Sequence, residues 1–210
     1  PEIKRKYNIE FSSGVRGFFT TNDSVMESKI FNRQYSAFEW GDNFLDCIDY
    51  TNDSELILNA PNVKFTEQEL NDEIQLCALI MRDIAYEIQK AISISLLENA
   101  NFLKDRSNAS CNQIRFIEYI DHTQGHKSSL SEHTDYECFT VIWQSCEGIE
   151  ILPANVADGW IRPTISNCSI IVLVGDMVEV FSNGVYQSCL HRVNLLSGNR
   201  RSIIYFSGLN

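Results

Sequence analysis

The pattern of apolar and polar positions divides the chain near residue 112. Before that point, apolar residues recur every three or four positions, which is typical of one face of an α-helix. Thr66 and Glu69 have the spacing of a capping box, so the helix is expected to begin at Thr66. Phe65 and Leu70 have the spacing of a hydrophobic staple at the same end. The apolar face comprises Leu70, Ile74, Cys77, Met81, Ile84, Ala85, Ile88 and Ile92. A shorter helix is expected over residues 96–103.

After residue 112 the period changes to two, and short apolar segments alternate with turn signals. Asn183-Gly184 is typical of a hairpin turn between two strands, and Gly175-Asp176 indicates another turn. Short strands at this spacing are typical of a sandwich or barrel, and they favour a jelly roll. Strands are expected over residues 112–121, 136–144, 148–152, 159–162, 169–174, 178–181, 185–191 and 200–207, with a polar loop over 123–131.

These elements predict one α+β domain, mainly β, over residues 1–210. The jelly-roll core is expected over residues 111–210. A mixed part with flanking helices is expected over residues 1–110, where residues 34–40 form a short strand. A chain of 210 residues is long enough to bury such a core.

Composition narrows the classes of partner. The net charge of −11 argues against the backbone of a nucleic acid and against an anionic membrane surface. No apolar run approaches twenty residues, so no membrane span is expected. The seven cysteines are odd in number and form no Cys-x-x-Cys pair, which favours reduced thiols in a cytoplasmic or nuclear protein. A small molecule is the expected partner, and the oligomeric state is not predicted.

Candidate metal ligands lie in the last third of the chain. His133 and Asp135 are two positions apart, so they are expected to project from the same face of one strand. His191 lies on a second predicted strand. Two imidazoles and one carboxylate hold Fe(II) on one face and leave the other positions open, although zinc accepts the same ligands. A lone histidine on a strand is more often a packed or surface residue, and His122 and His126 are interpreted as solvated loop residues.

A candidate anion site follows on the last predicted strand. Arg200 and Ser202 are two positions apart, so both can point inward while Arg201 points outward. A guanidinium binds a carboxylate through two parallel hydrogen bonds, and a neighbouring hydroxyl adds a third. This pair therefore suits the distal carboxylate of a dicarboxylic acid. Tyr119 can offer its phenol to the same group, although a half-buried aromatic role is the more common one.

Taken together, these motifs resemble the 2-oxoglutarate- and Fe(II)-dependent oxygenase family. The branch is that of isopenicillin N synthase and the plant flavonoid, gibberellin and ethylene-forming enzymes. The resemblance spans residues 112–208 and is carried by the segments 133–136, 174–176, 181–184, 191–193 and 200–203. It is weaker upstream, over residues 16–19 and the long helix. An opening strand of the family has no match before Pro1, so either a segment is missing at the start or the branch is divergent, and a missing segment is the expectation.

The resemblance implies a double-stranded β-helix and assigns roles to the candidate residues. It implies that His133, Asp135 and His191 bind Fe(II), and that Arg200 and Ser202 hold the cosubstrate 2-oxoglutarate with help from Tyr119. Arg201 is the alternative to Arg200, because the spacing from His191 is one residue shorter than the family's. O2 is the implied oxidant, ascorbate is a candidate reductant, and the products are succinate, CO2 and an oxidised small molecule.

Two other functions remain open. Isopenicillin N synthase is an iron oxidase that does not use 2-oxoglutarate, and its Arg-Ser pair binds the carboxylate of its own substrate. A non-catalytic metal-binding module is the second alternative, because the fold does not determine the function. The complete set of three ligands argues against this second alternative.

Overall fold

The structure, a computed structural model, describes residues 4, 6–8, 16–20, 35–41, 62–107, 112–119, 129–153, 159–166, 168–194 and 198–209. The chain divides into two compact units. The first unit comprises residues 1–18, 38–115 and 205–210, and the second comprises residues 19–37 and 116–204. All six candidate site residues belong to the second unit. His122 and His126, expected in a solvated loop, lie outside the described residues.

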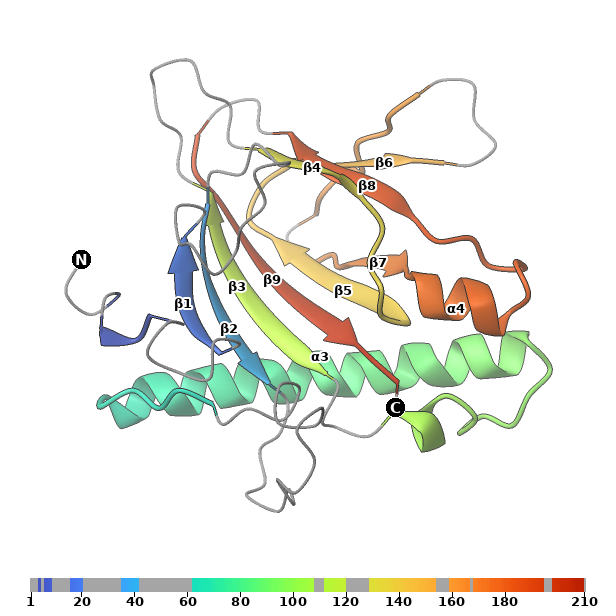
Figure 1. Cartoon of the computed structure of the whole chain (residues 1–210), viewed down its shortest axis with the longest axis horizontal. Coiled ribbons are helices and arrows are strands. Elements are labelled where there is room, and N and C mark those ends of the chain that lie inside the picture. The colour runs from blue at the N-terminus through green and yellow to red at the C-terminus, as the bar shows by residue number, and fades with distance from the viewer. Residues whose placement is uncertain are drawn as a thin grey trace. The chain divides into compact units, whose positions relative to one another are not determined.

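The described strands form two sheets, which confirms the prediction of a mainly β fold (Figure 1). The larger sheet has the order β1-β2-β3-β9-β5-β7, and the smaller has the order β4-β8-β6. The strands of the larger sheet are β1 (Gly17–Thr20), β2 (Ser36–Gly41), β3 (Gln113–Tyr119), β9 (Arg200–Ser207), β5 (Phe139–Gln144) and β7 (Ile171–Val174). Those of the smaller sheet are β4 (Ser129–His133), β8 (Leu190–Asn194) and β6 (Ile149–Leu152).

The long helix of the first unit, α3 (Gln68–Ser95), confirms the predicted helix but not its start. The N-cap is Glu67 and makes no side-chain capping bond, so the capping box of Thr66 and Glu69 is wrong. The Thr66 hydroxyl instead donates to the Glu67 carboxylate over 2.9 Å. The staple is also wrong, because Leu70 is 38% exposed and the Phe65 ring packs on Tyr7 at 4.6 Å between centroids.

Polar residues complete the buried face of α3. Gln89 and Ser93, together with Ala78, are buried beside the predicted Ile74, Met81, Ala85 and Ile92. The Gln89 amide donates to the Ser207 hydroxyl over 3.0 Å, which offsets part of the cost of burying this side chain. Although α3 has 28 residues, none of the described helices is both long and apolar enough to cross a membrane.

The prediction of a helix over residues 96–103 is wrong, because α3 ends at Ser95 in a turn that reverses the chain direction. Leu97 has a φ of 62°, and the amide of Glu98 donates to the carbonyl of Ser93 over 3.0 Å. This is the Schellman arrangement, which stops a helix by reversing its chain. Residues 96–103 then form turns that lead into a short 3-10 helix, η3 (Lys104–Arg106).

The strand predicted over residues 178–181 is also wrong, because these residues lie in the helix α4 (Asp176–Phe181). Asn183 and Gly184 have φ values of 53° and 78°, and the Gly184 amide donates to the Glu179 carbonyl over 2.9 Å. Both a hairpin turn and a Schellman helix end need residues that tolerate positive φ, so Asn-Gly alone does not distinguish them.

Three other predictions need smaller corrections. Residues 159–162 form no strand, and Ile161 makes only an isolated bridge with Ile151. Strand β8 begins at Leu190, well after the expected start. Part of the expected loop over 123–131 is strand, because β4 begins at Ser129.

Candidate functional site

The two candidate histidines lie opposite each other on neighbouring antiparallel strands. His133 ends β4 and pairs directly with His191 on β8, and the ring centroids are 4.2 Å apart. Strand β6 flanks β8 on its other side, where Ile151 pairs with His191. The backbone pairing of the small sheet therefore sets the spacing of the two imidazoles.

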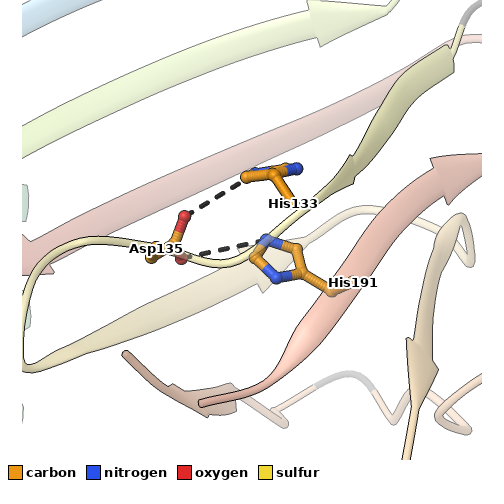
Figure 2. A group of neighbouring side chains, drawn as sticks. All are labelled: His133, Asp135 and His191. Atoms are coloured by element: carbon orange, nitrogen blue, oxygen red, sulfur yellow. Dashed lines mark ion pairs between the residues drawn. The ribbon is translucent and has the colours of Figure 1, made fainter. Parts of the chain in front are cut away.

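Asp135 joins the histidines from outside the strand. Strand β4 ends at His133, so the expectation that both residues lie on one strand is wrong. The chain nevertheless brings the carboxylate between the two rings, with Asp135 Oδ1 3.6 Å from His133 Nε2 and Oδ2 3.8 Å from His191 Nε2 (Figure 2). One candidate ligand atom from each residue lies within 4.8 Å of the others. Asp135 and His191 are buried.

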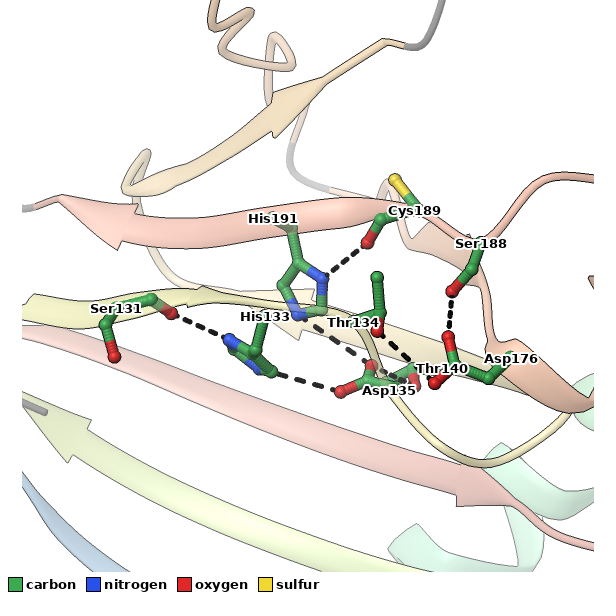
Figure 3. A network of polar contacts seen from close by, with 9 residues as sticks. All are labelled: Ser131, His133, Thr134, Asp135, Thr140, Asp176, Ser188, Cys189 and His191. Atoms are coloured by element: carbon green, nitrogen blue, oxygen red, sulfur yellow. Dashed lines mark hydrogen bonds and ion pairs between the residues drawn. The ribbon is translucent and has the colours of Figure 1, made fainter. Parts of the chain in front are cut away.

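Hydrogen bonds fix the orientation of both rings in the same way. His133 Nδ1 lies 2.8 Å from the Ser131 carbonyl, and His191 Nδ1 lies 2.9 Å from the Cys189 carbonyl (Figure 3). A carbonyl only accepts, so Nδ1 of each ring carries the hydrogen. In the neutral ring the lone pair is then on Nε2, the atom that faces Asp135. This is the arrangement that metal-binding histidines adopt.

The carboxylate is held by a hydroxyl on the next strand. Thr140 Oγ1, on β5, donates to Asp135 Oδ2 over 2.5 Å, and both side chains are buried. Asp135 Oδ1 keeps its position beside His133. Two unprotonated nitrogens and a carboxylate oxygen therefore converge in a set that fits Fe(II) and also fits zinc.

The side chains at the start of strand β9 alternate between buried and exposed positions, as predicted. Arg200 and Ser202 are each 1% exposed, whereas the Arg201 side chain is 73% exposed. Arg201 pairs with Glu118 at 3.1 Å. This burial pattern favours Arg200 over Arg201 as the inward-pointing arginine.

The Arg200 guanidinium is surrounded by neutral groups. Gln144 Oε1 accepts hydrogen bonds from Nε over 3.1 Å and from Nη2 over 2.7 Å, and Nη1 lies 3.5 Å from Ser202 Oγ. The Tyr119 ring is fully buried, with its centroid 5.0 Å from Arg200 Cζ. Burial lowers the pKa of Arg200, and Tyr119 partly offsets this shift. Among the described residues, no carboxylate forms an ion pair with Arg200.

Sequence reasoning missed Gln144, which ends the apolar strand β5. It is buried, and its Nε2 atom has no hydrogen-bond partner among the described residues. A glutamine at the end of an apolar run was the available signal. It carries no charge and belongs to no motif, so only the folded arrangement brings it to Arg200.

Comparisons with known proteins agree with this geometry. Residues 109–208 match the sequence profile of the 2OG-Fe(II) oxygenase superfamily. A homoarginine-6-hydroxylase of Arabidopsis thaliana is 30% identical over 91% of this chain and 53% of its own length. Isopenicillin N synthase of a Flavobacterium species is 26% identical over 70% of this chain and 45% of its own length. The chain spans about half the length of these curated relatives.

The fold also matches a solved structure. A full-length Neurospora crassa protein in complex with alpha-KG superposes with a TM-score of 0.77 at 21% identity, covering 100% of this chain and 67% of that chain. A likeness at this identity concerns the fold alone, and it confirms the expected double-stranded β-helix.

Proposed function

Because the chain belongs to the 2OG-Fe(II) oxygenase superfamily, we propose that it carries the catalytic core of an Fe(II)- and 2-oxoglutarate-dependent oxygenase. The reaction would oxidise a small molecule, most simply by hydroxylation, and release succinate and CO2. One observation carries the proposal. The same compact unit contains a convergent set of two histidines and an aspartate and a buried arginine that lacks an anionic partner among the described residues.

His133, Asp135 and His191 would hold the iron. The Nδ1 hydrogen bonds keep both Nε2 lone pairs directed at Asp135, so no proton has to leave a neutral ring when the metal binds. The carboxylate contributes one negative charge and is oriented by Thr140. Bound iron, with 2-oxoglutarate and O2, supplies the oxidising power to break a substrate C–H bond, and ascorbate would serve as the reductant that maintains Fe(II).

Arg200 would bind the distal carboxylate of 2-oxoglutarate. Gln144 Oε1 occupies the Nε–Nη2 edge of the guanidinium, which leaves Nη1 and the second hydrogen of Nη2 for a bidentate contact. Ser202 Oγ and the Tyr119 phenol would complete the site, and the buried Nε2 of Gln144 is a further donor. A carboxylate here would neutralise a charge that burial makes costly.

Strand β5 supports both halves of the proposed site. Thr140 contacts Asp135 near the start of the strand, and Gln144 contacts Arg200 at its end. Residues four apart lie on the same face of a strand, about 13 Å apart. The metal ligand and the cosubstrate arginine are thus tied to one rigid element.

An anaerobic titration of Fe(II) followed by 2-oxoglutarate tests the proposal. We expect a weak visible charge-transfer band from the iron chelate of 2-oxoglutarate. Asp135→Ala should abolish the band, and Arg200→Met should require much more 2-oxoglutarate to produce it. Arg201→Met is the matched control, because its side chain is exposed, and it should behave as the parent protein does. Absence of the band in iron-loaded parent protein would contradict the proposal.

The same titration separates the second candidate function. Similarity to isopenicillin N synthase supports an iron oxidase that does not use 2-oxoglutarate. That function requires iron binding without the band, and substrate-dependent O2 consumption without succinate. If neither consumption of 2-oxoglutarate nor that of O2 follows iron binding, a non-catalytic metal-binding module is the remaining explanation.

The substrate class and compartment are further parts of the proposal. A small molecule is favoured over nucleic acid by the net charge of −11, and homoarginine is the first compound to screen because a relative is named for it. A reducing compartment, the cytoplasm or the nucleus, is supported by the free thiols of Cys77, Cys138, Cys146, Cys168 and Cys189.

A further inference from the structure

Asp176, the first residue of α4, lies where the two segments that carry the candidate ligands meet (Figure 3). We propose that Asp176 is a positioning residue for the metal site. It ties the segment containing Asp135 to the segment that leads into His191. This inference rests on the proposed function only in taking these residues as the metal ligands.

The first half of the tie joins Asp176 to the Asp135 segment. Asp176 Oδ2 accepts a hydrogen bond from Thr134 Oγ1 over 3.3 Å, and the Asp176 amide donates to the Asp135 carbonyl over 2.8 Å. The side chain and the backbone of one residue therefore hold consecutive positions of the ligand segment. Asp135 Oδ2 is also held by Thr140, so hydrogen bonds hold both the backbone and the carboxylate of this residue.

The start of α4 packs directly onto the same segment. The amides of Gly175 and Met177 donate to the carbonyls of Cys138 and Glu137 over 2.8 Å and 3.3 Å. A Cβ atom at Gly175 would lie 2.1 Å from the Glu137 carbonyl oxygen, so only glycine permits this approach. Gly175 therefore brings Asp176 within hydrogen-bonding distance of Thr134.

The second half of the tie joins Asp176 to the His191 segment. Asp176 Oδ1 accepts a hydrogen bond from Ser188 Oγ over 2.5 Å, and Glu179 Oε2 accepts one from the Ser188 amide over 2.6 Å. The next residue, Cys189, donates its amide to the Val174 carbonyl over 2.9 Å. Its own carbonyl accepts from His191 Nδ1. A shift of Ser188 would therefore move the acceptor that orients the His191 ring.

A purely structural role for Asp176 predicts a different result. An acidic residue in the first turn stabilises a helix through its interaction with the helix dipole. Loss of that effect would lower stability without weakening metal binding selectively. A role in positioning predicts weaker metal binding, because loss of a partner that orients metal ligands lowers metal affinity by about 10–100-fold.

The experiment measures Co(II) affinity of the metal-free protein by the visible absorption of bound Co(II), together with the melting temperature of the metal-free protein. Asp176→Ala removes the shared acceptor. The double variant Thr134→Val/Ser188→Ala removes both donors and keeps the carboxylate. Asp83→Ala removes an exposed carboxylate from α3 and is the control. We expect both test variants to bind Co(II) about 10–100-fold more weakly than the parent and the control, with a changed Co(II) spectrum. The melting temperature should fall slightly in Asp176→Ala, which loses the helix-dipole interaction, and less in the double variant, which keeps the carboxylate.

Each outcome decides a separate question. Parent-like Co(II) affinity in folded Asp176→Ala overturns the inference. Weak binding in Asp176→Ala with parent-like binding in the double variant also overturns it, because Asp176 would then act through charge rather than through the two hydrogen bonds. If Asp176→Ala does not fold, the double variant alone decides. Failure of the parent protein to bind Co(II) would instead contradict the proposed function.

Discussion

The two ends of strand β5 face opposite electrostatic situations. At Thr140, the Asp135 carboxylate accepts a hydrogen bond from a hydroxyl and lies beside the unprotonated Nε2 atoms of two imidazoles. At Gln144, the Arg200 guanidinium meets only neutral acceptors among the described residues and is nevertheless 1% exposed. The first end is preorganised by the protein for a cation. At the second end, no carboxylate in the described part of the chain compensates the buried positive charge, which favours binding of an anion.

The largest expected effect comes from removing that charge. In the parent protein, 2-oxoglutarate should bind the iron form about 100-fold or more tightly than 2-oxopentanoate, which lacks the distal carboxylate. In Arg200→Met the two acids should bind with similar affinity, because the group that distinguishes them is gone. Titrations of the iron form with each acid, monitored through the charge-transfer band, measure both affinities. A preference that survives in Arg200→Met would place the carboxylate elsewhere.

A smaller effect is expected when the missing anion is supplied by the chain itself. Gln144→Glu places a carboxylate beside the guanidinium, so we expect 2-oxoglutarate to bind about 10-fold more weakly, while the melting temperature of the ligand-free protein rises. Gln144→Met is the matched variant, and there the ligand-free protein should melt lower because Arg200 loses its acceptor. Melting curves with and without 2-oxoglutarate measure both quantities. Tighter 2-oxoglutarate binding in Gln144→Glu would contradict this account of Arg200.

An effect of similar size, but on metal binding, is expected at the Thr140 end. Thr140→Val keeps the shape of the side chain but removes the donor to Asp135 Oδ2, so Fe(II) affinity should fall about 10-fold. Thr140→Ser should restore most of the affinity, because it returns the hydroxyl. An Fe(II) titration of both variants tests this prediction. The preference for 2-oxoglutarate over 2-oxopentanoate is the second measurement. If Thr140→Val lost its preference for 2-oxoglutarate by the same factor as its Fe(II) affinity, the two ends would not be independent.

Candidate metal-binding and anion-binding residues could be identified from the sequence because their types and spacings indicate chemistry. His133, Asp135, His191 and the Arg-x-Ser pair were identified in this way, and the structure brings the first three together. Strand alternation also predicted that Arg200 is buried and Arg201 exposed. Asp135 lies beside both imidazoles even though the strand ends before it.

Neutral partners and local geometry were not predictable in the same way. Thr140 and Gln144 lie in an apolar strand, and their roles depend on which side chains the fold places opposite them. The segment 178–181 is too short for its apolar pattern to distinguish strand from helix. The start of α4 makes contacts that cannot be predicted from the sequence, including those of Gly175 with Glu137 and Cys138.

The pairing of β5 has a consequence for how the protein can change in evolution. The strand is hydrogen-bonded to β7 on one side and β9 on the other, so its length and face cannot vary without disrupting the larger sheet. One inserted residue between Thr140 and Gln144 would turn one of them to the opposite face. Insertions and replacements are tolerated far better in loops. New substrates are therefore expected to arise through changes in loop residues, while the four-residue interval in β5 stays constant.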